Sequence, residues 1–165
     1  MEFYRTDRLI IRNVEEKDIP IIYDYRNNEI CARYQRGQVK ELKDIKELVV
    51  HRKNDTITER NNFMLAAALK DTDEMVGEIV VMPNDGCISL GYTFSYKHHR
   101  KGYAYESLSL LIEKLHAAYP DWEFICFTES ENKGSIALLE KLGYTHLGYT
   151  EKLASEIYGK WVREI

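Results

Sequence analysis

The stretch 75–119 constrains the fold more than any other part of the sequence. Two β-rich runs, 75–82 (MVGEIVVM) and 87–95 (CISLGYTFS), flank Pro83-Asn84-Asp85-Gly86, which is a strong signal for a hairpin turn. A basic turn that contains glycine follows, and residues 103–119 then carry apolar side chains at helical spacing: Ala104, Leu108, Leu111, Ile112 and Leu115. We therefore expect an antiparallel strand pair that leads through a glycine turn into an amphipathic helix.

The rest of the chain alternates between strand-like and helix-like runs. Further strands are predicted at 8–14, 63–69, 122–128, 144–150 and 157–165. Helices are predicted from residues 13–16 onward, with Ile19, Ile22 and Tyr23 on one face, and at 42–51 and 135–142, whereas 27–38 shows no clear preference. The strand–helix–strand unit 87–128 should be a right-handed parallel crossover. The sequence thus predicts one mixed α/β domain over residues 1–165, with a partly antiparallel central sheet flanked by helices.

Composition excludes several classes of protein. The net charge of −4 and a pI of about 5.8 argue against nucleic acid as a partner. No apolar run approaches the roughly 20 residues that span a bilayer, and residues 1–7 are too polar for a secretory signal. Three widely spaced cysteines do not form a disulfide framework, which favours a reducing, cytoplasmic compartment. No metal is expected, because the pair His98-His99 lacks a suitably spaced partner.

The turn after the strand 87–95 has the features of an anion site. Residues 97–101 place five titratable nitrogen side chains in a row, Gly102 permits an unusual backbone conformation, and a helix begins directly afterwards. Free N–H groups and the helix dipole favour an anion at such a place, although a solvated turn would have the same composition. Neither a P-loop nor a dinucleotide-binding fingerprint is present.

Three motifs in this chain resemble the GNAT N-acetyltransferase superfamily. His99-Arg100-Lys101-Gly102-Tyr103-Ala104 resembles its Q/R-x-x-G-x-G/A acyl-CoA signature. The opening 6–12 (TDRLIIR) resembles the T-x-R-L-x-L-R start of the branch that acetylates protein amino termini, including those of ribosomal proteins. The segment 132–144 resembles that branch's N-x-x-S-x-x-x-L-x-K-x-G-[FY] pattern. The motifs occur in the family order, so the resemblance covers nearly the whole chain.

The resemblance implies an acetyl-CoA-dependent N-acetyltransferase. Acetyl-CoA would be the co-substrate, and a primary amine would attack it directly in a ternary complex. The acceptor would be a protein amino terminus or a small-molecule amine, and the protein would act as a monomer or homodimer without a membrane partner. The alternative is a catalytically silent, regulatory acyl-CoA-binding module.

The resemblance also implies roles for particular residues. The strand 87–95 would splay from 122–128, so that the backbone of Thr93, Phe94 and Ser95 lies along the pantetheine arm and the Phe94 N–H faces the developing oxyanion. Asn132 would face the thiol end. Ser135 would hydrogen-bond or protonate the leaving thiolate, unless it only caps its helix. The residues expected to bind the pyrophosphate are His99, Arg100, Lys101, Gly102, Tyr103 and Ala104.

The sequence departs from the family pattern where acid–base groups are expected. His99 replaces Gln or Arg at the first signature position, and Leu139 stands where many members carry a tyrosine that serves as general acid. Tyr144 is an alternative acid, or else a core aromatic. Glu78 and Glu106 are possible bases, or else a solvated strand carboxylate and a helix-stabilising charge. The residue that acts as the general base therefore stays open.

Overall fold

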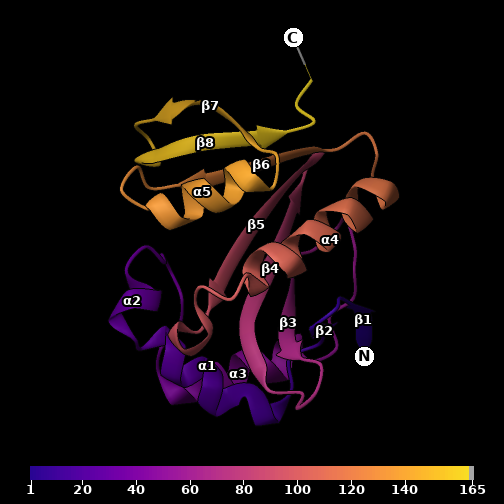
Figure 1. Ribbon diagram of the computed structural model, residues 1–165, viewed down its shortest axis with the longest axis vertical. Helices are drawn as coiled ribbons and strands as arrows, with labels where there is room; N and C mark the ends of the chain where they lie inside the picture. Colours follow the sequence, from indigo (N-terminus) through magenta and orange to yellow (C-terminus); the bar gives the residue numbers. More distant parts are fainter. Residues whose placement is uncertain (164–165) are drawn as a thin grey trace.

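A mixed eight-stranded sheet runs through the computed structural model, which describes residues 1–163 (Figure 1). The strand order is β1-β2-β3-β4-β5-β6-β8-β7, and only the β5–β6 pair is parallel within the described chain. The predicted mixed α/β fold with a partly antiparallel sheet is confirmed, as is the parallel crossover. The strands are β1 (Glu2–Arg5), β2 (Leu9–Arg12), β3 (Phe63–Leu69), β4 (Met75–Asn84), β5 (Cys87–Phe94), β6 (Glu123–Thr128), β7 (Thr145–Thr150) and β8 (Ser155–Lys160).

Helices flank this sheet. They are α1 (Ile19–Arg26), α2 (Glu29–Ala32), α3 (Leu42–Arg52), α4 (Tyr103–Ala118) and α5 (Lys133–Lys141), with short 3-10 turns η1 (Glu16–Asp18) and η2 (Tyr96–His98). None of the helices within residues 1–163 is both long and apolar enough to cross a membrane.

Alternation along β3 explains why helices are needed on both sides. Phe63, Leu65 and Ala67 belong to one buried cluster, together with residues of α4. Met64 and Ala66 belong to a second cluster, together with residues of α1 and α3. Because successive strand residues point to opposite faces, a run that is apolar at every position has to be covered twice. The uniformly apolar sequence of β3 therefore reflects a central strand.

The structure corrects several details of the predicted elements. The short strand β1 and the single-turn α2 were not predicted, because four residues give too little periodicity. Tyr23 is 44% exposed, whereas Tyr25 is buried, because Tyr25 follows Ile22 by three residues and shares its side of α1. The last strand, expected at 157–165, occurs at 155–160, and residues 164–165 lie outside the described part of the chain.

The strands β5 and β6 separate soon after they meet. Their ladder holds only the pairs Cys87 with Glu123 and Ile88 with Phe124, whereas β4 and β5 stay paired from Asn84–Cys87 to Gly77–Phe94. Figure 1 shows β5 diverging from β6 beyond this short contact. The predicted splay is confirmed, and it leaves one edge of β5 without a neighbouring strand.

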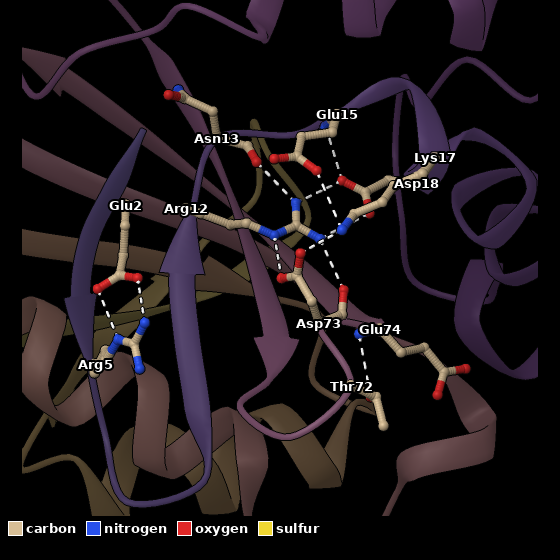
Figure 2. A network of polar contacts seen from close by, with 10 residues as sticks. All are labelled: Glu2, Arg5, Arg12, Asn13, Glu15, Lys17, Asp18, Thr72, Asp73 and Glu74. Carbon is tan, nitrogen blue, oxygen red and sulfur yellow. Dashed lines mark hydrogen bonds and ion pairs between the residues drawn. The ribbon is translucent and has the colours of Figure 1, made fainter.

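A buried arginine joins β2 to two other segments (Figure 2). Arg12 is 4% exposed and donates to both carboxylate oxygens of Asp18, at 2.8 and 3.0 Å, and to Asp73 Oδ1 at 2.8 Å. It also donates to the Asn13 and Asp73 carbonyl oxygens, at 2.9 and 3.1 Å. Lys17, which is exposed to solvent, also forms an ion pair with Asp73. One guanidinium therefore fixes β2, the start of α1 and the β3–β4 turn relative to one another.

Candidate active site

The turn between β5 and α4 exposes a set of unused backbone donors. Arg100 and Gly102 both have left-handed backbones, with φ of +63° and +80°. The first amide of α4 with a backbone acceptor is that of Glu106, which donates to the Gly102 carbonyl oxygen at 3.0 Å. Within the described chain, the amides of residues 100–105 have no such acceptor. They lie at the positive end of a 16-residue helix, which is favourable for an anion.

The basic side chains of this turn divide into two groups. His99 uses Nε2 to contact the Phe94 carbonyl oxygen at 2.7 Å, and Lys97 approaches Asp24 at 3.7 Å. Arg100 and Lys101 are exposed and have no ion-pair partner among residues 1–163. Arg100 and Lys101 are thus the two side chains that could reach a bound anion as free charges, while His99 holds the turn against β5.

The resemblance implies that CoA binds at this turn, so replacing Arg100 and Lys101 together by glutamine should weaken CoA binding and flatten its dependence on salt. Both charges are exposed, so salt screens their attraction to phosphate, whereas the backbone amides stay in place and some binding remains. Titration calorimetry at several salt concentrations measures both effects. The double variant Lys43→Gln/Lys46→Gln on α3 removes the same charge elsewhere and serves as the control. An unchanged affinity and salt slope for the Arg100/Lys101 variant would mean that these side chains are only solvated.

A cleft of about 530 Å³ lies at the splay. β5 and β6 form its walls, the first turns of α5 border it, and the segment 34–39 lies across it. Gln35 donates to the Tyr92 carbonyl oxygen at 3.2 Å, and Gln38 donates to Thr93 Oγ1 at 2.9 Å. Residues 34–38 of this segment belong to the stretch 27–38, for which the sequence shows no clear preference. The residues of the predicted site that line the cleft are Thr93, Asn132 and Ser135, together with Leu139.

The free edge of β5 presents backbone groups to this cleft. The Ser95 amide donates to the Val76 carbonyl oxygen at 2.8 Å, so it is paired with β4 and is not available, contrary to our expectation for a ligand along residues 93–95. Because backbone groups alternate along a strand, those of Phe94 and Tyr92 point away from β4. The Phe94 N–H therefore points to the side of β5 that faces the splay, but Phe94 is buried and does not itself line the cleft. The Phe94 ring packs where Gly77 leaves room, since a Cβ there would lie 2.4 Å from it.

Ser135 does not cap α5. Asn132 is the capping residue, and its Oδ1 accepts a hydrogen bond from the Ser135 amide at 3.2 Å. The Ser135 hydroxyl instead lies 2.8 Å from the hydroxyl of Tyr92. The serine side chain is thus free of a structural capping role. Tyr92 was not among the predicted site residues, although strand alternation with Leu90 would place it on the α5 side of the sheet.

The two possible bases are both held by structural contacts. Glu78 is 1% exposed and accepts hydrogen bonds from Tyr25 at 2.7 Å and from Arg26 at 2.8 and 2.7 Å, so it is not a solvated strand carboxylate. Glu106 accepts from the Thr6 hydroxyl at 2.5 Å and from the Arg8 amide and Nε at 3.0 and 2.8 Å. Burial would raise the pKa of Glu106, but these hydrogen bonds outweigh it and the pKa lies below its ordinary value. The T-x-R motif at the amino terminus therefore holds the first turn of α4.

Other candidates lie outside the cleft. Tyr144 is 4% exposed and packs in the core beside α4, as expected of a core aromatic. In the described residues, no three His, Cys, Asp or Glu side chains gather closely enough to hold a metal ion. The polar groups of the cleft are thus backbone donors, hydroxyls, amides and arginine-paired carboxylates.

Comparison with known proteins agrees with this geometry. A family model described as an acetyltransferase (GNAT) domain matches residues 8–145. The uncharacterized N-acetyltransferase YnaD of Bacillus subtilis is 28% identical over 149 residues, which are 89% of this chain and 85% of that protein. A GNAT-family acetyltransferase from Bacillus anthracis has a TM-score of 0.81 at 22% identity, over 96% of each chain. RimL, a ribosomal L7/L12 α-N-protein acetyltransferase solved in complex with CoA, has a TM-score of 0.79 at 15% identity, over 97% of each chain. Since the family model spans most of the sequence, this chain belongs to the GNAT acetyltransferase family.

Proposed function

We propose that this acetyltransferase moves the acetyl group of acetyl-CoA to a primary amine, which attacks it directly while both are bound. One observation carries the proposal: the unused amides of 100–105 follow the carboxyl end of β5, and the edge of β5 that lacks a neighbouring strand borders the cleft at the splay. An anionic group at the helix start and an extended chain along β5 could be bound together there. The CoA in the RimL structure supports the same co-substrate for this fold.

The phosphate end would be bound by the β5–α4 turn. The backbone amides of Gly102, Tyr103 and Ala104 would donate hydrogen bonds, and Arg100 and Lys101 would add charge. His99 would contribute by fixing the turn, since its ring is already bound to the Phe94 carbonyl oxygen. The cap Asn132 would set the position of Ser135 beside the thiol end.

The reaction needs charge stabilisation at two atoms. Negative charge develops on the acetyl oxygen as the amine attacks, and the Phe94 N–H is the donor directed at the splay. Negative charge then passes to sulfur as the carbon–sulfur bond breaks. The Ser135 hydroxyl lines the cleft and would donate a hydrogen bond to that sulfur.

The acceptor that suits this cleft is an α-amino group. Two carboxylates line it in the described chain: Glu78 is bound to Tyr25 and Arg26, and Glu129 forms an ion pair with Arg36 at 3.4 Å, so each already has a cationic partner. The amine has to be neutral when it attacks. An α-amino group has a pKa near 7.7–8.0 and a lysine-type amine near 10.4, so roughly 300-fold more of the former is neutral at pH 7. The fold shared with RimL agrees with a protein amino terminus as acceptor.

Replacing Gly102 by valine should weaken CoA binding at least tenfold, or about 1.4 kcal/mol. A β-branched side chain is strained at a φ of +80° and would stand where phosphate has to approach the backbone. Titration calorimetry with CoA measures the effect. Gly86→Val is the matched control, because Gly86 has a φ of +81°, has open space around it and lies in the β4–β5 hairpin. If Gly102→Val binds CoA as tightly as Gly86→Val, the phosphates do not lie at this turn.

A further inference from the structure

The contact between Tyr92 and Ser135 joins the two walls of the splay. Tyr92 projects from β5 and Ser135 from the first turn of α5, and their hydroxyl oxygens are 2.8 Å apart. Both residues line the cleft. Leu139, one turn further along α5, is 1% exposed and carries no polar group. Within the described chain, the hydroxyl partner recorded for Ser135 is therefore the phenol of Tyr92.

The chemistry of the two hydroxyls favours one oxygen as the donor. Among residues 1–163, Ser135 is the hydrogen-bond partner of the partly buried Tyr92 hydroxyl, and a phenol is the more acidic hydroxyl and therefore the better donor. Burial raises the pKa of Tyr92 above its ordinary value, so the phenol keeps its proton at neutral pH. A serine hydroxyl has one hydrogen and can accept through its lone pairs. When Tyr92 donates to Ser135 Oγ, the serine hydrogen has to point elsewhere, and the cleft is the open side.

Resting on the proposed acetyl transfer, we infer that Tyr92 is a positioning residue that turns the Ser135 O–H toward the leaving sulfur. No proton leaves Tyr92 in this role. As the amine nitrogen bonds to the acetyl carbon and the carbon–sulfur bond breaks, the electron pair goes to sulfur, which accepts the Ser135 hydrogen bond. The proton lost by the amine passes to water, and the released thiolate takes a proton from solvent.

If Tyr92 acts by orienting Ser135, the effect of replacing Tyr92 on kcat should depend on the presence of the Ser135 hydroxyl. Tyr92→Phe should lower kcat about five- to tenfold, which is the scale of one misaligned hydrogen bond, and should leave the KM for acetyl-CoA within twofold. In a Ser135→Ala background, the same change should alter kcat by less than twofold, because there is no longer a hydroxyl to orient. Tyr144→Phe removes a buried phenol from the core against which Tyr92 packs, outside the cleft, and should leave kcat within twofold.

A second measurement needs no acceptor amine. The absorbance of the thiolate reports the pKa of the thiol in bound CoA, which is near 8.5 for a free cysteine-type thiol. An oriented Ser135 donor should lower this pKa, and Tyr92→Phe, Ser135→Ala and the double variant should all raise it equally. If Ser135→Ala raises the thiol pKa while Tyr92→Phe leaves it at the wild-type value, or if Tyr92→Phe slows the Ser135→Ala protein as much as the wild type, the inference is wrong.

The two measurements separate the failure of this inference from the failure of the proposed function. Equal shifts of the thiol pKa in a protein that acetylates no amine would support the role of Tyr92 and contradict acetyl transfer. Normal acetyl transfer with additive effects of Tyr92→Phe and Ser135→Ala on kcat would support acetyl transfer and contradict the role of Tyr92. A protein that binds no CoA would contradict both.

Discussion

Replacing Arg12 by alanine should lower the free energy of unfolding by about 3–5 kcal/mol. Asp18 is 1% exposed, and Arg12 contacts both of its carboxylate oxygens. Without the guanidinium, a buried carboxylate keeps the Glu15 amide, at 2.8 Å, as its remaining recorded donor among residues 1–163. The loss reflects this uncompensated charge, and two carbonyl oxygens also lose a donor. Urea unfolding followed by circular dichroism measures it.

Arg5→Ala is the control for this substitution. Arg5 also makes a two-point contact with a carboxylate, that of Glu2, at 2.8 and 2.9 Å, but both side chains are exposed (Figure 2). Exposed pairs of this kind contribute at most about 1 kcal/mol. Equal losses for Arg5→Ala and Arg12→Ala would show that burial of the Arg12 network does not determine its contribution.

The Arg12 network also makes the free energy of unfolding depend on pH. Burial raises the pKa of Asp73, but hydrogen bonds from Lys17 and Arg12 outweigh it and the folded-state pKa is lowered. Because the pKa of Asp73 is lower in the folded than in the unfolded protein, its ionised form stabilises the fold. This stabilisation is fully present above the unfolded-state pKa of about 3.9 and is lost as the pH falls through the folded-state pKa. The Arg12→Ala protein should therefore lose less stability on acidification than the wild type.

Ser135→Ala should lower kcat about ten- to a hundredfold, with little change in CoA affinity. A hydrogen bond to sulfur matters most when the sulfur carries charge, which happens in the transition state and not in the bound thioester. Steady-state kinetics and calorimetry on the same protein separate the two quantities. The melting temperature should stay near that of the wild type, because Asn132 caps α5 and Ser135 does not.

Ser130→Ala is the matched control for Ser135. Ser130 lies in the same β6–α5 connection, is exposed and donates to Glu156 at 2.6 Å. It should keep the wild-type kcat. A Ser135→Ala protein with normal kcat would mean that the thiolate leaves without help from this hydroxyl. The role proposed for Tyr92 would then also be wrong, because Tyr92 is proposed to act only by orienting Ser135.

Apart from the short β1, the strands of the sheet could be predicted because their sequences carry local information. β3 is apolar at every position and β4–β5 are joined by a Pro-Asn-Asp-Gly turn, so burial and the hairpin follow from neighbouring residues. The left-handed Gly102 was also predictable, since the turn contains one glycine at the start of a helix. The left-handed Arg100 was not, because its side chain carries no comparable signal.

The parts of the site that sequence reasoning missed depend on contacts between distant residues. Glu78 is paired with Arg26, 52 positions earlier, and no local pattern distinguishes such a carboxylate from a solvated one. Gln35 reaches the Tyr92 carbonyl oxygen across 57 positions from a segment without periodicity. The contact of Ser135 with Tyr92 spans 43 positions and depends on how β5, after it separates from β6, lies beside α5.

Transfer of radiolabelled acetyl groups tests the central claim most directly. The purified protein is incubated with labelled acetyl-CoA and one of three acceptors: a lysine-free peptide with a free amino terminus, a peptide with a blocked amino terminus and one lysine, or spermidine. We predict that label enters the free-amino-terminal peptide as an amide, with one CoA thiol released per acetyl group, and enters the other two much more slowly. If the protein binds CoA in calorimetry but transfers label to none of the three, the claim that it is an N-acetyltransferase is contradicted, and the chain is an acyl-CoA-binding module.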